Sequence, residues 1–211
     1  QINLLAENAE GYQNLLLLIS KAWLEAPPGM PARISHDFLA QHASGLIALT
    51  GNLGGEVPNA LLRGQPREAE RIVARYLEIF GEHNVFIEVQ RAGLVEHDTL
   101  LPQLLELGEA TGVPCVATND VHYLLPEQAR AHEVLMCIGL GIKAREDPAW
   151  LPTTSLDLAD PAEMRRRFGY VIFSTEGDGF GHIFPELWQE RPGGPEPEQT
   201  LAQIEEAARK G

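Results

Sequence analysis

The sequence predicts an α/β fold in which short strands alternate with helices. Three observations support this prediction: apolar runs of strand length recur along the chain, helical stripes separate them, and turns rich in glycine or proline mark the boundaries. Strands and helices in alternation are typical of a parallel sheet with crossover helices. A chain of 211 residues is long enough for one domain with a sizeable core and an appendage.

The beginning of the chain predicts a strand and two helices. Residues 1–6 have the pattern of the end of a strand, and Asn8 is placed to cap the helix that follows. The prolines and the glycine of residues 26–30 end this helix, and Ser35 caps a short second one. The first helix carries apolar residues on one face: Leu15, Leu16, Ile19, Ala22 and Trp23.

Three further strands are expected at residues 45–50, 84–90 and 113–118. Each is short and apolar, and the second is rich in residues that favour β structure. The first of the three runs into a glycine-rich turn at residues 51–55. Their spacing makes a parallel sheet the expected arrangement.

Helices are expected between and after these strands. Pro66 suits the first turn of one helix, and Gly112 ends the next, which carries a leucine stripe. The helix that starts at Pro66 has an apolar stripe of Ile72, Val73, Tyr76 and Phe80. A last helix, at residues 127–138, is predicted to have an inner face of Val134, Leu135 and Ile138.

The composition is that of an ordinary globular protein, with 44% hydrophobic and 22% charged residues. A net charge of -14 argues against direct binding to a nucleic-acid backbone, which requires clustered Lys and Arg, and fits a solvated acidic face. Cys115 and Cys137 lie in apolar stretches, which favours a reduced, cytoplasmic compartment over a disulfide scaffold. The longest apolar run, Leu15 to Ile19, is too short to span a membrane.

The loop after the last predicted strand contains the most informative residues. In folds of this class the chemistry gathers where strands end and loops begin. Asp120 and His122 follow the strand directly, and a carboxylate and an imidazole placed there can both reach a divalent cation. The alternative is that Asp120 caps the next helix and His122 only packs. Both interpretations are compatible with the spacing.

Glu88 is a second candidate, because it lies within the predicted strand 84–90. A carboxylate inside a buried strand costs free energy unless it is paired or binds a metal ion, although Glu88 can also face solvent or Arg91. The glycine-rich turn at residues 51–55 has the freedom to wrap a ligand, and a structural turn explains it equally well. His132 is expected to be exposed or half-buried. A surface position is expected for the remaining histidines: His36, His42, His83 and His97.

Five blocks, in order, resemble the PHP (polymerase and histidinol phosphatase) domain of the bacterial DNA polymerase III alpha subunit. They cover roughly residues 1–168, and the most similar is Val-Ala-Thr-Asn-Asp-Val-His-Tyr at 116–123, continued by residues 132–138. The other blocks lie at residues 4–22, 45–56 and 86–90. The resemblance implies a distorted, seven-stranded (βα)7 barrel, of which this chain holds a part.

The resemblance also implies a site. Complete members of the family bind a cluster of divalent metal ions, which supports phosphoester hydrolysis in some members and has decayed in others. By match to the motif, Asp120 and His122 would be the last pair of ligands, for zinc, manganese or magnesium.

This chain departs from the family pattern at several ligand positions. The opening His-x-His motif is absent, and Gln1 stands where a histidine is often found. Asn52 replaces a frequent cysteine, and Ala92 replaces a histidine present in some members. With two probable ligands left, an incomplete metal site is expected.

The predicted organisation is therefore a partial PHP domain at residues 1–168 and a divergent tail at residues 169–211. The tail has the pattern of a short α+β appendage, made of a hairpin, a Pro- and Gly-rich linker and a closing helix capped by Thr200. Because the chain opens with Gln1 rather than Met, it is expected to be a fragment of a longer protein.

The expected function is a part in DNA replication, within a DNA-directed DNA polymerase (a nucleotidyltransferase) whose catalytic residues this segment lacks. Its expected partners are the remaining polymerase domains and replisome subunits, with DNA reached through the parent polymerase and no membrane involved. Two alternatives stay open: a free-standing metal-dependent phosphoesterase of the same superfamily, and a non-catalytic interaction module. Histidines encoded upstream of Gln1 would favour the phosphoesterase.

Overall fold

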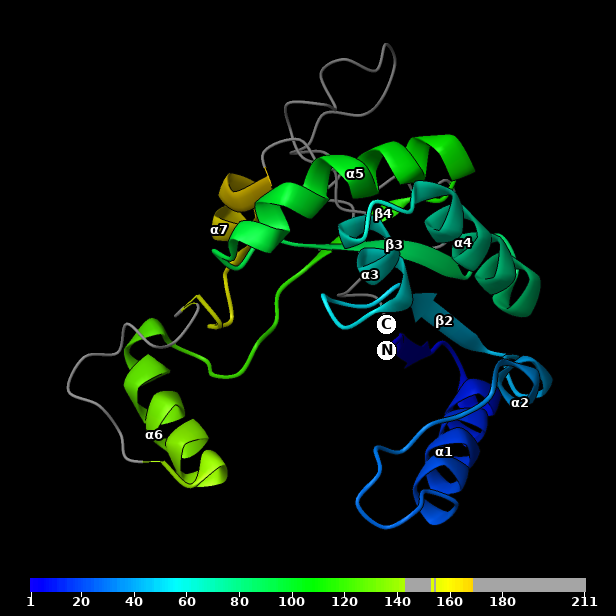
Figure 1. Ribbon diagram of the computed structural model, residues 1–211, viewed down its shortest axis with the longest axis horizontal. Coiled ribbons are helices and arrows are strands. Elements are labelled where there is room, and N and C mark those ends of the chain that lie inside the picture. The colour runs from blue at the N-terminus through cyan, green and yellow to red at the C-terminus, as the bar shows by residue number, and fades with distance from the viewer. Residues whose placement is uncertain (143–152, 154, 169–211) are drawn as a thin grey trace, which may run out of the picture. The chain divides into compact units, whose positions relative to one another are not determined.

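The computed structural model describes residues 1–142, 153 and 155–168, which form a mixed α/β fold with a four-stranded sheet (Figure 1). Two compact units can be separated. Unit 1 consists of Gln1–Gln90 with Val95–Pro114, and unit 2 consists of Arg91–Leu94 with Cys115–Gly211. Each unit is described by itself.

Three strands of unit 1 lie side by side: β1 (Asn3–Ala6), β2 (Leu46–Leu49) and β3 (Val85–Gln90). β2 and β3 are parallel, with Ala48 opposite Val85, which confirms the predicted parallel pairing of these two strands. β1 runs antiparallel to β2, with Asn3 opposite Leu49. The sheet is therefore mixed.

Two capped helices follow β1, as predicted. α1 (Ala9–Leu24) begins after Asn8, whose side-chain oxygen accepts a hydrogen bond from the Gly11 N–H at 2.9 Å. α2 (His36–Gln41) begins after Ser35, whose hydroxyl oxygen accepts one from the Phe38 N–H at 3.3 Å. Each cap satisfies one of the amide groups that the first turn of a helix leaves without an intrahelical partner.

α1 and β2 approach each other through two glycines. A side-chain carbon built on Gly11 would lie 1.7 Å from the carbonyl oxygen of Gly45, and the same carbonyl accepts a hydrogen bond from the Glu7 N–H at 2.9 Å. The buried residues of α1 are Gly11 and Leu18. Its predicted apolar face is largely exposed, with Trp23 at 70%.

Three helices complete unit 1: α3 (Glu56–Leu62), α4 (Pro66–Phe80) and α5 (Val95–Thr111). α4 starts at Pro66 as predicted, and its apolar stripe is buried throughout. α3 was not predicted, because it has only seven residues and includes Pro58, too little chain to show a helical period. α5 ends before Gly112, which has a φ of 71°.

The core of unit 1 lies between its sheet and these helices. Leu46, Ala48, Val85, Ile87 and Val89 are fully buried. The predicted surface position of His97 is wrong, since this residue is only 5% exposed on α5. Its neighbours in sequence are polar, but its place on the helix brings it to the packed side, and a prediction from local polarity could not show this.

Tyr76 gives the core of unit 1 an expected sensitivity to alkali. Burial, followed by the nearby Glu56 carboxylate, raises the pKa of the Tyr76 hydroxyl well above its ordinary value, while Arg75 opposes this shift. Above about pH 10 the unfolded chain releases this proton and the folded chain retains it, so that folding loses stability as the pH rises.

We therefore expect Tyr76→Phe to lose less stability than the parent protein between about pH 8 and about pH 11. The free energy of unfolding in urea at the two pH values is the measurement. Tyr12→Phe is the matched control, since this tyrosine is 54% exposed. An identical loss in the parent and in Tyr76→Phe would contradict the expectation.

Unit 2 contains β4 (Cys115–Thr118), the short 3-10 helix η1 (Pro126–Gln128), α6 (Ala129–Leu140) and α7 (Pro161–Phe168). The predicted inner face of α6 is wrong: Val134, Leu135 and Ile138 are exposed at 37%, 65% and 71%. Glu133 and Cys137 are buried instead. The apolar residues of α6 itself are spread over more than one face of the helix, so their spacing does not indicate which face is buried.

Both cysteines, Cys115 and Cys137, are free and buried. This agrees with the predicted absence of a disulfide scaffold. Among the described residues, no helix is long and apolar enough to cross a membrane. The described chain contains four strands, so that the seven-stranded barrel stays a prediction. The predicted tail, residues 169–211, lies outside the described residues.

Candidate functional site

The loop after β4 brings Asp120 and His122 together. The Asp120 Oδ2 atom lies 3.3 Å from the His122 Nε2 atom, and the two side chains are 43% and 44% exposed. Neither residue caps the next helix, because η1 begins at Pro126 and α6 follows it. The pair is therefore a partly exposed carboxylate and imidazole that already interact with each other.

The rings around His122 form a small aromatic group in unit 2. The His132 ring on α6 lies 4.9 Å from the His122 ring, measured between centroids, and 5.5 Å from the Tyr123 ring. His132 is half-buried, as predicted. The sequence places His132 in the same block as the motif but does not show that its ring lies beside that of His122.

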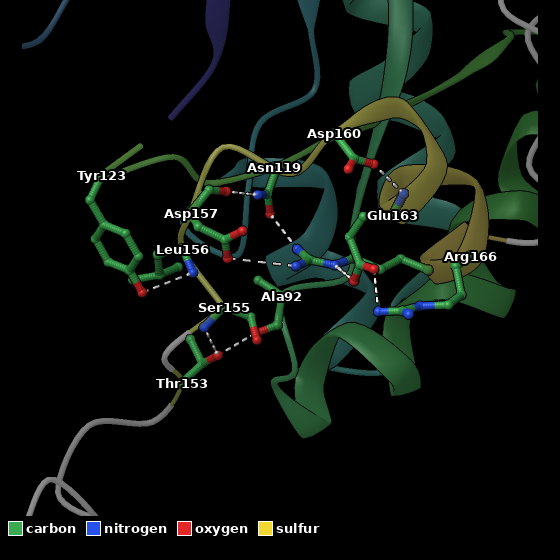
Figure 2. A network of polar contacts seen from close by, with 11 residues as sticks. Ala92, Asn119, Tyr123, Thr153, Ser155, Leu156, Asp157, Asp160, Glu163 and Arg166 are labelled. Atoms are coloured by element: carbon green, nitrogen blue, oxygen red, sulfur yellow. Dashed lines mark hydrogen bonds and ion pairs between the residues drawn. The ribbon is translucent and has the colours of Figure 1, made fainter. Parts of the chain in front are cut away.

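Neighbours of Asp120 and His122 hold the loop in place (Figure 2). The Asn119 side-chain amide donates to the Asp157 carbonyl oxygen, and the Tyr123 hydroxyl accepts from the Leu156 N–H at 3.3 Å. Backbone hydrogen bonds join the same two segments, from the His122 N–H to the Leu156 carbonyl oxygen at 2.9 Å among others. Within the motif, Asn119 and Tyr123 thus have structural partners.

Arg167 on α7 is central to this network. Its guanidinium group lies 3.3 Å from Asn119 Oδ1, 2.8 Å from Glu163 Oε1 and 3.7 Å from Asp157 Oδ1. The Arg167 side chain is 14% exposed, as is that of Asp157. The backbone carbonyl of Arg167 accepts a further hydrogen bond from the Arg91 guanidinium at 2.7 Å. Arg167 therefore links the loop after β4, through Asn119, to Asp157 and Glu163 later in the chain.

In unit 1, Glu88 on β3 is the second predicted site residue, and it is buried, at 3% exposure. The interpretation that it faces solvent is wrong. The Asn3 side-chain amide donates to Glu88 Oε2 at 2.8 Å, and the Gln90 side-chain amide donates to Glu88 Oε1 at 3.1 Å. Its backbone N–H donates to the hydroxyl oxygen of the fully buried Thr50 at 2.9 Å. Two amide groups thus hydrogen-bond the carboxylate, one on each oxygen.

The end of β2 is polar as well. The backbone nitrogen of Gln1 donates to the Gly54 carbonyl oxygen at 3.2 Å, and the Asn52 side-chain oxygen accepts from the Gly54 N–H at 3.0 Å. The positions where the family often has a histidine and a cysteine thus carry amide side chains, Gln1 and Asn52. Both contact the glycine-rich turn.

The amides around Glu88 lead to an expected result. Asn3→Ala removes one donor from a buried carboxylate, which costs about 2 kcal/mol of the free energy of unfolding. Urea unfolding of the variant measures this loss. Asn14→Ala is the control, because Asn14 donates a single exposed hydrogen bond to the neutral Ser44 carbonyl oxygen and its loss should cost less than about 1 kcal/mol. Equal losses in the two variants would show that the Asn3 amide adds nothing specific.

A multi-metal cluster does not fit the described residues. Each cation of such a cluster needs several His, Cys, Asp or Glu side chains that converge on it. Within residues 1–142, 153 and 155–168, no three such side chains are placed to hold a metal ion. In unit 1 both oxygens of Glu88 accept hydrogen bonds from amide groups, those of Asn3 and Gln90. The side chains around Glu88 therefore form a polar edge of unit 1 that is rich in amide groups rather than in metal ligands.

Residues 1–92 match the family described as the PHP domain. Over these residues the chain is similar to a PHP domain. This confirms the resemblance seen in the sequence, and the matched residues include the whole amide-rich edge around Glu88. Asp120 and His122 lie beyond them, in the part of the chain that resembles polymerase subunits.

The chain is homologous to part of several bacterial DNA polymerase III alpha subunits. It is 47% identical over 144 residues to that of Treponema pallidum, which covers 68% of this chain and 12% of that protein. It is 39% identical over 171 residues to the Pseudomonas aeruginosa subunit, with 80% of this chain and 14% of that protein covered. It is 35% identical over 205 residues to the Deinococcus radiodurans subunit, with 96% of this chain and 15% of that protein covered.

The chain thus spans well under a quarter of the length of the curated relatives it matches. The residues missed from the sequence are Asn3 and Gln90 around Glu88, and Arg167 beside Asn119. A usable signal existed for Gln90, since residues two apart on a strand share a face. Asn3 and Arg167 meet their partners 85 and 48 positions away, and a single sequence carries no signal for such pairs.

Proposed function

We propose that this chain acts in DNA replication as the PHP-domain part of a DNA polymerase III alpha subunit. The observation that carries the proposal is the homology to these subunits, which reaches 96% coverage of the chain in the Deinococcus protein. The active form is then a cytoplasmic polymerase much longer than this segment, and nucleotidyl transfer takes place on carboxylates elsewhere in it.

Within that polymerase, we assign the segment a scaffold role. Its expected partners are the other polymerase domains and the replisome subunits that dock on them. DNA is held by other parts of the polymerase, which the net charge of -14 supports, because phosphate contacts require clustered cations. Asp120 and His122 remain candidate ligands for zinc, manganese or magnesium in an incomplete site.

The chemistry around Glu88 supports the scaffold role over phosphoester hydrolysis. A hydrolytic metal cluster requires anionic or imidazole ligands to hold the cations and to activate water. The amide-rich edge of unit 1 offers one carboxylate, with an amide on each oxygen. An amide donor bonds a carboxylate well, and it competes with a cation for the same oxygen lone pairs.

Metal titration of the purified protein tests the scaffold role. With Asp120→Ala and His122→Ala measured alongside, we expect no stoichiometric zinc or manganese in the parent protein and the same titration curve in both variants. Stoichiometric metal that both substitutions remove would contradict the scaffold role. It would favour the alternative, a metal-dependent phosphoesterase.

Primer extension by the complete gene product tests the replication role separately. We expect template-directed extension by the complete protein, with rates unchanged by Asp120→Ala or His122→Ala. A complete protein that folds but does not extend a primer would overturn the assignment to replication.

A further inference from the structure

One face of α1 is apolar and exposed, although the helix belongs to unit 1 and follows β1 directly (Figure 1). Its residues recur at intervals of four, three and four, which places them on the same side of a helix: Tyr12, Leu16, Ile19 and Trp23. We call these four residues the α1 stripe. Each is between 44% and 70% exposed, and an exposed apolar patch of this kind marks an interaction surface.

The surface beside the α1 stripe carries no charge. The four residues that flank it along the helix are neutral: Gln13 and Ser20 on one side, Leu15 and Ala22 on the other. Lys21 lies away from the stripe, since its amino group is 2.6 Å from the Glu25 carboxylate and 4.6 Å from the centre of the Phe38 ring on α2. In pairs of helices the charges at flanking positions select the partner. Here no such charge selects an acidic or a basic partner, and none repels a second copy at the contact.

The α1 stripe is also complementary to itself. In an antiparallel pair of helices with a twofold axis through the middle of the stripe, the first position faces the last and the second faces the third. Tyr12 then lies opposite Trp23 of the second copy, and Leu16 lies opposite Ile19. An aromatic side chain thus meets an aromatic one and an aliphatic side chain meets an aliphatic one, so that the facing residues are similar in size along the whole pair.

We propose that the α1 stripe is an interface between two copies of this chain, packed as an antiparallel helix pair. A large side chain that is fully exposed offers about 200 Å², so the exposed fractions of the stripe correspond to roughly 400 Å² per copy. A standard interface buries about 800 Å² per partner. The dimer is therefore weak and depends on concentration. The proposal rests on unit 1 alone and is independent of the replication role.

Sedimentation equilibrium of the 211-residue chain between about 1 µM and about 1 mM tests the proposal. We expect a monomer–dimer equilibrium, with a Kd raised about tenfold or more in Leu16→Glu, because each copy then places a carboxylate against apolar side chains. Leu135→Glu is the matched control, since Leu135 is an exposed leucine on the other strongly apolar helix, α6. Its Kd should equal that of the parent protein. Added salt should tighten the parent dimer, because it screens the repulsion between two chains of net charge -14.

Two charge variants test the antiparallel arrangement. Leu16→Lys and Ile19→Glu should each stay monomeric alone, because either substitution places a charge in the apolar contact. An equimolar mixture of the two should dimerise, since position 16 faces position 19 in the antiparallel pair and the introduced ammonium group meets the introduced carboxylate. In a parallel pair position 16 faces position 16, and the mixture would bring no opposite charges together.

Three results would overturn the proposal: a Kd raised equally by Leu135→Glu, a mixture of the two charge variants that stays as monomeric as its components, or a parent protein that stays monomeric over the whole range. The last result would leave the α1 stripe as a surface for another part of the polymerase. Thermal unfolding confirms that each variant is folded.

Discussion

Gly11→Ala is expected to reduce the free energy of unfolding by more than about 3 kcal/mol. The added carbon would lie 1.7 Å from the Gly45 carbonyl oxygen, and the obstacle is backbone rather than the end of a flexible side chain. That carbonyl also bonds the Glu7 N–H, so a movement of β2 away from α1 breaks a further contact. The Gly11 backbone is helical, so conformational strain adds nothing to this loss.

Gly139→Ala separates this steric effect from helix propensity. Gly139 lies in α6, and nothing lies within 4 Å of a side-chain carbon built there. Alanine at this site is expected to be neutral or to stabilise by up to about 1 kcal/mol. Urea unfolding of both variants is the measurement. A Gly11→Ala protein as stable as Gly139→Ala would mean that α1 and β2 do not approach as closely as described.

Arg167→Met is expected to cost about 3 kcal/mol. The substitution keeps much of the apolar stem but leaves Asp157 without its guanidinium partner, Glu163 with Arg166 alone, and the Asn119 side-chain oxygen without the Arg167 donor. Removal of one member of a buried ion pair costs more than the pair itself contributes, because the other charge stays behind. We place the loss at the low end of the usual range, since the pair is 14% exposed.

Arg166→Met provides the comparison on the same helix. Arg166 also pairs with Glu163, but its side chain is 78% exposed, and such surface pairs contribute about 0–1 kcal/mol (Figure 2). The free energy of unfolding of the two variants should therefore differ by about 2 kcal/mol. Similar losses at both positions would show that the network around Asn119 adds little to the stability of unit 2.

Much of the fold follows from local signals. Asn8, Ser35 and Pro66 mark helix starts because capping and proline geometry act within one turn, and all three helices begin where expected. The prediction of a buried apolar stripe on α4 is confirmed, because polar residues occupy the other side of this helix and leave a single apolar face. The faces of α1 and α6 are not predictable in this way, since both helices are apolar over more than one face.

The same difference between local and long-range signals applies to the candidate site. Asp120 and His122 stand two apart in one loop, so their proximity is visible in the sequence. The partner of Glu88 is Asn3, at the other end of unit 1 in the sequence, and the partner of Asn119 is Arg167 on a later helix. Contacts of this kind depend on the packing of whole elements, and a single sequence without homologues does not encode them in any local pattern.

The two buried thiols can report on local opening of the structure. Cys115 and Cys137 both belong to unit 2, and unit 1 contains no cysteine. A thiol reagent can reach a buried sulfur only when the surrounding structure opens, so the rate of labelling reports local opening of unit 2. Arg167→Met should accelerate labelling, and the rate in Gly11→Ala shows whether a lesion in unit 1 also opens unit 2.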